Sequence, residues 1–236
     1  MSDSPEYSAP AIDKALDILE LLAESSSPMS QLEIATAIGL SAGQIFRPLL
    51  RLEKRGYLSR DKQSGLYQLS LRMFDLAHRQ EPLRSLLSVA VPIMRELAAE
   101  IGQSCNLGTL DNRGVRIVAQ VESPADFGFR VRVGALFDLA HTATGMVLAA
   151  FSDEPCDGVA ENVLKAIRRD GIFVLPDSAQ PGITDVVVPI LRSDGREALA
   201  AITVPYISTS YSPSGVDAVL ERTAQAAQRI QVALGL

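Results

Sequence analysis

Residues 30–65 read SQLEIATAIGLSAGQIFRPLLRLEKRGYLSRDKQSG, and this stretch decides the fold of the first part of the chain. Ser-Gln-Leu-Glu at residues 30–33 has the Ser-x-x-Glu form of a capping box, which predicts the start of a helix. Gly39 predicts a left-handed C-cap at the end of that helix. A second capping-box form, Ser-Ala-Gly-Gln, follows at residues 41–44. Two short helices joined by so tight a turn predict a helix-turn-helix.

The second of these helices is predicted to run to about Arg55. Ile45, Leu49 and Leu52 fall on one face, and Arg and Gln side chains fall mostly on another. Arg and Gln can read guanine and adenine edges in the major groove of DNA. Pro48 lies inside the helix and predicts a kink or a carbonyl without its helical partner. The DNA contacts predicted for this helix are Ser41, Gln44, Ile45, Arg47, Arg51 and Arg55.

A hairpin is predicted directly after Gly56. Residues 57–60 and 66–69 alternate between apolar and polar around the turn at residues 61–65. Arg60 and Lys62 are predicted to touch phosphate or a minor groove. Helix, turn, helix and wing in this order predict that the partner is double-stranded DNA. The alternative is a small-molecule sensor or enzyme whose winged helix mediates only protein contacts.

Charge is distributed unevenly along the 236 residues, whose formal net charge is −6. Residues 41–80 hold eight Lys and Arg against three acidic residues, whereas the chain on either side is acidic. One basic island in an acidic protein suits a localised phosphate-contacting surface. A solvated helix face is the other explanation of the same pattern.

The remaining sequence predicts a helix at residues 12–22, a short helix at 71–80 and a longer one at 83–101. Strands are predicted at 105–111, 115–120, 127–133, 172–175, 185–191 and 198–204. Further helices are predicted at 142–151 and 162–169, and a last one capped by Ser212-Pro213. The predicted organisation is a disordered tail (1–10), a winged helix-turn-helix domain (11–70), a linker helix (71–82) and an α+β domain (83–236).

Several classes of function find no support in the sequence. There is no long uncharged apolar run, so no contact with a membrane is expected, and two cysteines suit a reducing cytoplasm. No catalytic constellation is evident, and the cysteines lack the spacing of a zinc site. No Gly-rich phosphate loop appears either. We therefore expect no enzyme activity, no metal and no cofactor.

The whole chain from about residue 12 resembles a transcriptional regulator of the IclR type. The resemblance rests on four stretches whose order and spacing are more specific than any one of them. They are KALDIL at residues 14–19; FR at 46–47 with LEKRGY at 52–57; QVESP at 120–124 with RVG at 132–134 and TATG at 142–145; and PGI at 181–183, PI at 189–190 and DGR at 194–196.

The resemblance implies a winged helix, a linker helix and a GAF-like domain, with an antiparallel sheet flanked by helices, that binds a small-molecule metabolite. It also implies homodimers through the N-terminal domains and homotetramers through the C-terminal ones. Family members often carry His where Ala140 stands and Cys where Asp185 stands. An Asp in the cavity would repel an anion unless it is protonated or paired, which argues against the usual small carboxylate effector.

The candidate effector contacts follow from the resemblance and from position. They are Val133, Gly134, Phe137, His141, Thr142, Gly145, Asp185 and Thr203. Each has a simpler structural explanation beside it. His141 can be satisfied by backbone, Asp185 can cap a strand, and Thr203 can face the core. Phe137 can be a surface aromatic, and Gly145 can serve close packing of a helix on a sheet instead of offering N–H groups to an anion.

Overall fold

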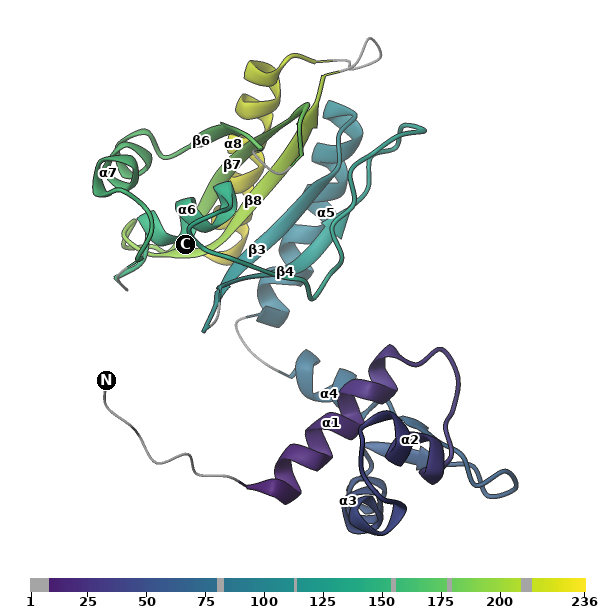
Figure 1. Ribbon diagram of the computed structural model, residues 1–236. Coiled ribbons are helices and arrows are strands. Elements are labelled where there is room, and N and C mark those ends of the chain that lie inside the picture. Colours follow the sequence, from purple (N-terminus) through teal and green to yellow (C-terminus); the bar gives the residue numbers. More distant parts are fainter. Residues whose placement is uncertain (1–8, 80–82, 113, 154–155, 178–179, 209–213) are drawn as a thin grey trace. The chain divides into compact units, whose positions relative to one another are not determined.

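The computed structural model describes residues 9–79, 83–112, 114–153, 156–177, 180–208 and 214–236. The chain divides into two compact units, Met1–Gln80 and Glu81–Leu236 (Figure 1). The first has one hydrophobic core and the second has two. Of the predicted tail, residues 1–8 lie outside the described part, and the first helix already begins at Pro10.

The first unit is built from helices α1 (Pro10–Glu24), α2 (Gln31–Ala37), α3 (Ala42–Lys54) and α4 (Arg72–His78) and strands β1 (Leu58–Arg60) and β2 (Tyr67–Leu69). This order confirms the predicted helix-turn-helix and wing. The apolar positions of α1, α2 and α3 converge with one residue from each strand. The buried residues of this core are Ile18, Leu22, Ile34, Ala35, Ile45, Leu49, Leu52, Leu58 and Tyr67.

Local chemistry sets the tight turn between α2 and α3. The Ser30 N–H donates to Glu33 Oε2 at 2.7 Å and the Glu33 N–H donates to Ser30 Oγ at 3.3 Å, so the predicted capping box is present. Gly39 has a φ of +69°, and the N–H of Leu40 donates to the carbonyl of Ala35 at 2.8 Å. These contacts form a Schellman ending, which turns the chain into α3 within a few residues.

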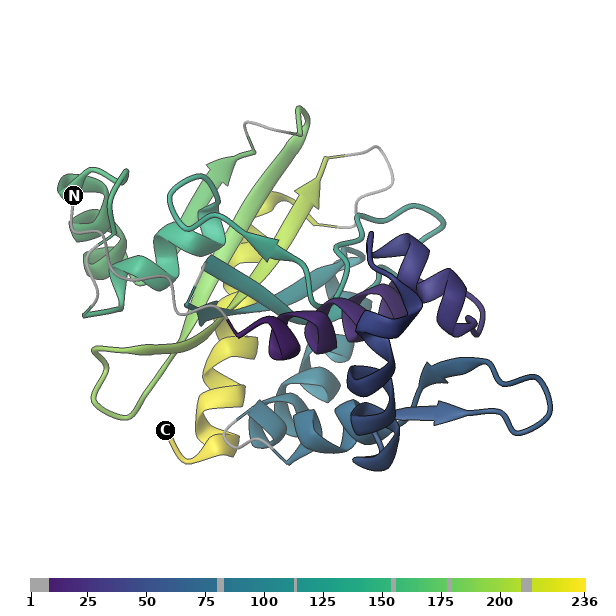
Figure 2. The ribbon, with the colours of Figure 1, turned by 60° about the horizontal axis from the view of Figure 1, so that its bottom comes forward.

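The wing is an antiparallel hairpin in which Leu58 is opposite Leu69 and Arg60 is opposite Tyr67. Met29 exchanges two backbone hydrogen bonds with Tyr67, at 2.9 and 2.7 Å, which anchors the base of the hairpin beside the start of α2. Figure 2 shows the loop of the hairpin extending away from the helices of its own unit. The wing is thus fixed at its base and open at its tip.

The second unit is a six-stranded antiparallel sheet with helices on both faces. It contains α5 (Leu83–Ile101), β3 (Cys105–Asp111), β4 (Gly114–Val121), β5 (Leu136–Phe137), α6 (Ala143–Ala150), α7 (Glu161–Asp170), β6 (Phe173–Pro176), β7 (Ile183–Leu191), β8 (Ala198–Ile207) and α8 (Val216–Leu234). The strand order is β5-β4-β3-β8-β7-β6. This arrangement confirms the predicted α+β class.

Two separate cores lie on the two faces of this sheet. Helices α5 and α8 pack side by side against one face, where Leu107, Ile202 and Val204 are buried (Figure 1). Helices α6 and α7 belong to the core on the other face, together with Val187 and Ala201. Residues one apart on β7 and β8 therefore contribute to opposite cores, as the two-residue period of a strand requires.

The predicted strand at residues 127–133 is wrong, because this segment forms no ladder in the structure. The Gln120 side chain forms hydrogen bonds with its backbone instead. It accepts from the Val131 N–H and donates to the Phe129 carbonyl, each at 3.4 Å. Just beyond it, Leu136 and Phe137 pair with β4. The segment thus crosses over one face of the sheet as a strap, and we call residues 123–135 the strap.

Two other predictions concern the ends of elements. Helix α8 starts at Val216 with Gly215 at its N-cap, and the predicted cap at Ser212-Pro213 lies outside the described residues. The predicted turn at residues 112–114 includes Arg113, which also lies outside them. Among the helices in the described part of the chain, none has the length and apolar content needed to cross a membrane.

Candidate nucleic-acid interface and ligand cavity

Helix α3 separates apolar from basic residues around its axis. Ile45, Leu49 and Leu52 are buried in the core of the first unit, and Arg47, Arg51 and Arg55 are exposed. Arg47 and Arg51 on α3, and Arg55 at its C-cap, therefore present three guanidinium groups to solvent. A helix with exposed Arg side chains has the size and the donors needed to enter a major groove.

Ile45 does not belong to this exposed set. Its side chain is 0% exposed and packs in the core, so its prediction as a DNA contact is wrong. The residue lies on the side of α3 that faces the other helices, as its spacing from Leu49 and Leu52 requires. The next residue, Phe46, is 52% exposed instead and is an apolar side chain on the outer surface of α3.

Ser41 and Gln44 are both exposed at the start of α3, but they also contact each other. The side-chain oxygen of Gln44 accepts from the Ser41 N–H at 2.9 Å and contacts the Ser41 hydroxyl at 3.0 Å. This is the reciprocal half of a capping box. In this conformation Gln44 holds the helix start, and it would have to release that contact to read a base edge with its amide oxygen.

Pro48 lies within α3, which remains one continuous helix from Ala42 to Lys54. Proline has no N–H, so the carbonyl of Gln44 lacks its usual helical donor. Helix α3 therefore carries an intrinsic weak point directly after Arg47.

The wing presents two exposed cations, of which Arg60 is anchored to the hairpin. Arg60 lies over the ring of Tyr67 at 5.1 Å and donates from Nε to the Gly65 carbonyl at 3.1 Å. Asp61 accepts from the Gln63 and Ser64 N–H groups at 3.0 and 2.6 Å and shapes the tip of the wing. Lys62 is exposed at this tip. The geometry presents Lys62 to a phosphate backbone more readily than Arg60.

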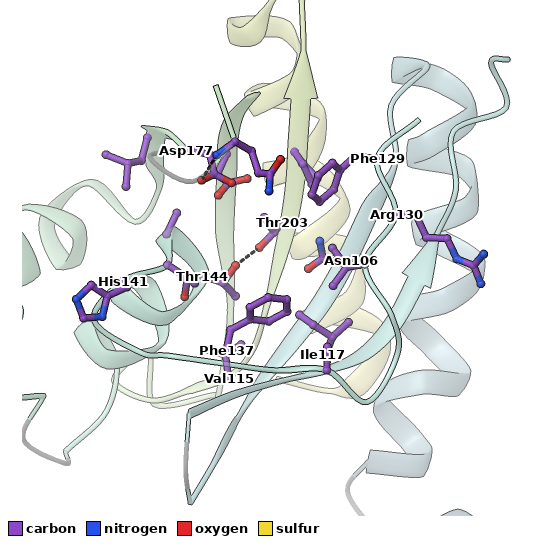
Figure 3. Close-up of a pocket in the computed structure, with 18 of the residues that line it drawn as sticks. Asn106, Val115, Ile117, Phe129, Arg130, Phe137, His141, Thr144, Asp177 and Thr203 are labelled. Carbon is purple, nitrogen blue, oxygen red and sulfur yellow. Dashed lines mark hydrogen bonds between the residues drawn. The ribbon is translucent and has the colours of Figure 1, made fainter. Parts of the chain in front are cut away.

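A cavity of about 380 Å³ opens on the face of the second unit's sheet that α6 partly covers (Figure 3). The strap, together with Asp177 and Gln180, provides its rim. Of the residues predicted to bind the effector, Phe137, His141, Thr142, Asp185 and Thr203 line it. The other lining residues are Asn106, Val115, Ile117, Phe129, Arg130, Val131, Arg132, Ala135, Ala143, Thr144, Leu175, Asp177, Gln180 and Pro205.

Val133, Gly134 and Gly145 do not line this cavity. Gly134 has a φ of +88° and its N–H donates to the Ile117 carbonyl at 2.7 Å, so it turns the strap into β5. The Gly145 N–H donates to Thr142 Oγ1 at 3.1 Å, and a Cβ at Gly145 would lie 2.2 Å from the Leu139 carbonyl oxygen. Close packing therefore explains Gly145, and its N–H is already occupied.

His141 and Thr142 line the cavity while serving the loop before α6. His141 Nδ1 lies 2.8 Å from Asp138 Oδ1, and the His141 side chain is 84% exposed. Thr142 Oγ1 donates to the Asp138 carbonyl at 2.8 Å and caps α6. Both side chains are thus engaged with the chain itself, although the partner of the His141 ring is the Asp138 side chain and not the backbone group that the simpler explanation named.

The floor of the cavity is made by three polar side chains on neighbouring elements. Thr144 on α6 and Thr203 on β8 share a hydrogen bond of 2.6 Å (Figure 3). Asn106 on β3 is paired in register with Thr203 and is only 3% exposed. Its Oδ1 is buried and has no hydrogen-bond partner within the described part of the chain. A buried acceptor without a donor is costly, so a ligand that supplies one is favoured here.

Asp185 and Asp177 give the other side of the cavity an acidic character. Burial, reinforced by the nearby Asp177 carboxylate, raises the pKa of the Asp185 carboxyl to about 6. None of the ion pairs among the described residues involves Asp185. Asp177 Oδ1 accepts from the Gln180 N–H at 3.1 Å. Both residues are half-buried.

Asn106, Thr144 and Asp177 were not among the predicted contacts. A pairing of β3 with β8 would have pointed to Asn106, because it places Asn106 beside the predicted Thr203. Thr144 lies two residues after the predicted Thr142, in the same TATG stretch. Asp177 belongs to no motif in the sequence that would have singled it out.

Two family models match the chain. The IclR helix-turn-helix domain matches residues 11–62, and the bacterial transcriptional regulator IclR C-terminal domain matches residues 83–158. The chain belongs to the IclR family of bacterial transcriptional regulators. This IclR-family protein is accordingly a DNA-binding transcriptional regulator, in a family of regulators and not of enzymes.

Curated relatives extend over most of this IclR-family chain. The glycerol operon regulatory protein of Streptomyces griseus is 31% identical over 226 residues, which cover 88% of this chain and 89% of that protein. The protein of the same name from Streptomyces coelicolor is 29% identical over 214 residues, covering 87% of this chain and 82% of that protein.

Solved structures of the family share the fold. An IclR homolog from Microbacterium hydrocarbonoxydans complexed with 4-hydroxybenzoate superposes with a TM-score of 0.75 at 20% identity, covering 95% of this chain and 99% of that chain. The Thermotoga maritima IclR superposes with a TM-score of 0.71 at 21% identity, covering 95% and 98%. Similarity at this level of identity establishes the architecture of the IclR-family protein and leaves its ligand to its own residues.

Proposed function

We propose that this protein binds an operator as a homodimer, with α3 of each copy in a major groove and the wing against the backbone. The observation that carries this proposal is the exposed row of Arg47, Arg51 and Arg55 on the helix that follows the tight turn and at its C-cap. Two copies related by a twofold axis would meet two half-sites about 34 Å apart, one turn of DNA.

A small molecule bound in the cavity controls this binding in our proposal. The lining combines apolar walls with a few polar groups, and a volume of about 380 Å³ accepts a small metabolite. The ligand acts by stabilising one of two arrangements of the chain that differ in operator affinity. The bound 4-hydroxybenzoate of the Microbacterium relative is consistent with such a role for this fold.

Operator binding is tested with the intergenic DNA beside the protein's own gene in a gel-shift assay. The variant Arg47→Ala plus Arg51→Ala loses two groove cations, so we expect at least about a hundredfold weaker binding. The parent protein should show a steep fall of affinity with salt, because each phosphate contact releases counterions.

A matched control removes two exposed cations from the other unit. Arg84→Ala plus Arg95→Ala changes the net charge by the same amount on α5 and should leave the affinity within about twofold. Equal losses in the two double variants would mean that only the overall charge matters, and the assignment of α3 would fall.

Control by a ligand is tested by adding compounds to the preformed DNA complex. Glycerol and 4-hydroxybenzoate are natural first candidates, since two relatives are named for a glycerol operon and one solved relative is complexed with 4-hydroxybenzoate. Release or tightening of the complex by a compound should vanish when the cavity is filled by Thr203→Phe. A compound effect that survives this filling would place the control elsewhere.

A further inference from the structure

The chemistry of the cavity specifies its ligand more narrowly than the proposed function does. Three acceptor groups border it, namely the Asn106 side-chain oxygen and the carboxyl groups of Asp177 and Asp185. The buried Asn106 oxygen needs a donor, and the half-buried Asp185 carboxylate, which lies beside a second acid, favours a cation. A carboxylate ligand would bring a third negative charge beside two existing ones.

The basic side chains that line the cavity are Arg130, Arg132 and His141. Arg130 and Arg132 lie on the exposed strap, whereas the two aspartates are half-buried. Arg130 Nε is paired with Glu122 at 3.2 Å, and Figure 3 shows its guanidinium directed away from Thr203 and Thr144. Exposed charges are screened by water and salt far more than partly buried ones. His141, the remaining titratable group, is bonded to Asp138.

The strand register places Asn106 at one end of the cavity and the two aspartates at the other. Asn106 is opposite Thr203, Thr203 is opposite Val187, and Asp185 lies two residues before Val187 on β7. Asp177 directly follows β6, in which Leu175 is opposite Asp185. With strands about 5 Å apart and about 3.3 Å per residue, the Cα atoms of Asn106 and Asp185 are separated by about 12 Å. Apolar side chains, including Ile117, Phe129 and Phe137, line the cavity alongside them.

We propose that the effector is a small organic amine: its ammonium group binds Asp185 and Asp177, its apolar body contacts Phe129 and Phe137, and a second donor reaches Asn106. This rests on the proposed function of the cavity as the effector site. The ammonium meets both carboxylates where a carboxylate would be repelled, and the second donor satisfies the buried Asn106 oxygen.

Three phenolic probes of similar size that differ in their terminal group test the charge preference. Tyramine, tyrosol and 4-hydroxyphenylacetate share a phenol and a two-carbon arm that ends in an ammonium, a hydroxyl or a carboxylate. At mildly alkaline pH we expect tyramine to bind at least about tenfold more tightly than 4-hydroxyphenylacetate, with tyrosol between them, by calorimetry and thermal shift.

The variant Asp185→Asn should weaken tyramine at least about tenfold and leave tyrosol nearly unchanged. Asp153→Asn, an exposed acid of the same unit, is the matched control and should behave as the parent. In Asn106→Ala the advantage of tyramine over phenethylamine, which lacks the phenol hydroxyl, should disappear. Circular dichroism establishes that each variant is folded.

Three outcomes overturn the amine assignment. They are 4-hydroxyphenylacetate binding as tightly as tyramine, a tyramine preference that survives Asp185→Asn, or no binding of tyramine. The gel shift with intergenic DNA, run on the same samples, separates this from the proposed function. If the parent protein binds DNA in a salt-dependent way but prefers the carboxylate probe, only the ligand class is overturned. If the parent protein does not bind the DNA at all, the proposed function is overturned.

Discussion

Thr144 and Thr203 share a 2.6 Å hydrogen bond that ties α6 to β8 at the floor of the cavity (Figure 3). Both residues are buried. Gly108 on β3 makes this approach possible, since a Cβ there would lie 2.9 Å from Thr144 Cγ2. The contact therefore joins the helix beside the cavity to the centre of the sheet.

We expect Thr203→Val to destabilise the second unit by about 1–3 kcal/mol, because the Thr144 hydroxyl would remain buried without a partner. Adding Thr144→Val should cost much less than a second full penalty, since both polar groups are then gone. Urea denaturation of the parent, the two single variants and the double variant measures this coupling. Strictly additive losses would show that the hydrogen bond contributes nothing of its own.

Gly145 is required by packing. Its Cβ position lies 2.2 Å from the Leu139 carbonyl oxygen, so Gly145→Ala must displace backbone and should cost at least about 2 kcal/mol. Gly43 in α3 has open space around its Cβ position, and Gly43→Ala should stabilise its helix by about 0.5–1 kcal/mol. Thermal unfolding followed by circular dichroism compares the two. A neutral Gly145→Ala would refute the close approach of α6 to the loop before it.

Asp185 should make stability depend on pH. Its pKa is raised from 3.8 to about 6 by burial and by Asp177, so the folded state binds the proton more tightly than the unfolded state does. The contribution of Asp185 is then most favourable below about pH 4, declines as pH rises, and reaches its full cost above about pH 6. Asp185→Asn should gain about 1–2 kcal/mol over the parent above pH 6 and lose this advantage toward pH 4.

Denaturant unfolding at a series of pH values measures this difference, with Asp153→Asn as an exposed control. A difference between Asp185→Asn and the parent that is constant across the whole range would contradict burial as the cause of the raised pKa.

Pro48 weakens α3 in our interpretation. Pro48→Ala restores the missing N–H donor to the Gln44 carbonyl and should stabilise the first unit by about 1–2 kcal/mol, after allowance for the freer unfolded chain. Circular dichroism during urea denaturation measures the change. Lower stability of Pro48→Ala would mean that packing of the proline ring stabilises the first unit. The gel shift would then show whether operator affinity also depends on Pro48.

The order of helices and strands in the first unit could be predicted because its determinants are local. The Ser30–Glu33 capping box, Gly39 and the alternation around the wing act within a few residues of themselves. The inward direction of Ile45 could also be predicted from its spacing to Leu49 and Leu52. The same spacing argues against a DNA contact at Ile45.

The cavity was only partly predictable, since its residues come from distant parts of the chain. Thr203 and Asp185 could be placed by resemblance, but Asn106 reaches the cavity because β3 pairs with β8. The segment 127–133 alternates like a strand, yet the Gln120 side chain takes up its backbone groups and leaves it as a strap.

By itself, then, the sequence determined the family, the helix-turn-helix with its wing and the basic face of α3, because caps, turns and helical spacing are short-range effects. Only the tertiary structure decided which polar groups face the cavity and how deeply Asp185 and Asn106 are buried. Burial and desolvation depend on every element packed around a side chain, and this is a property of the assembled sheet and helices.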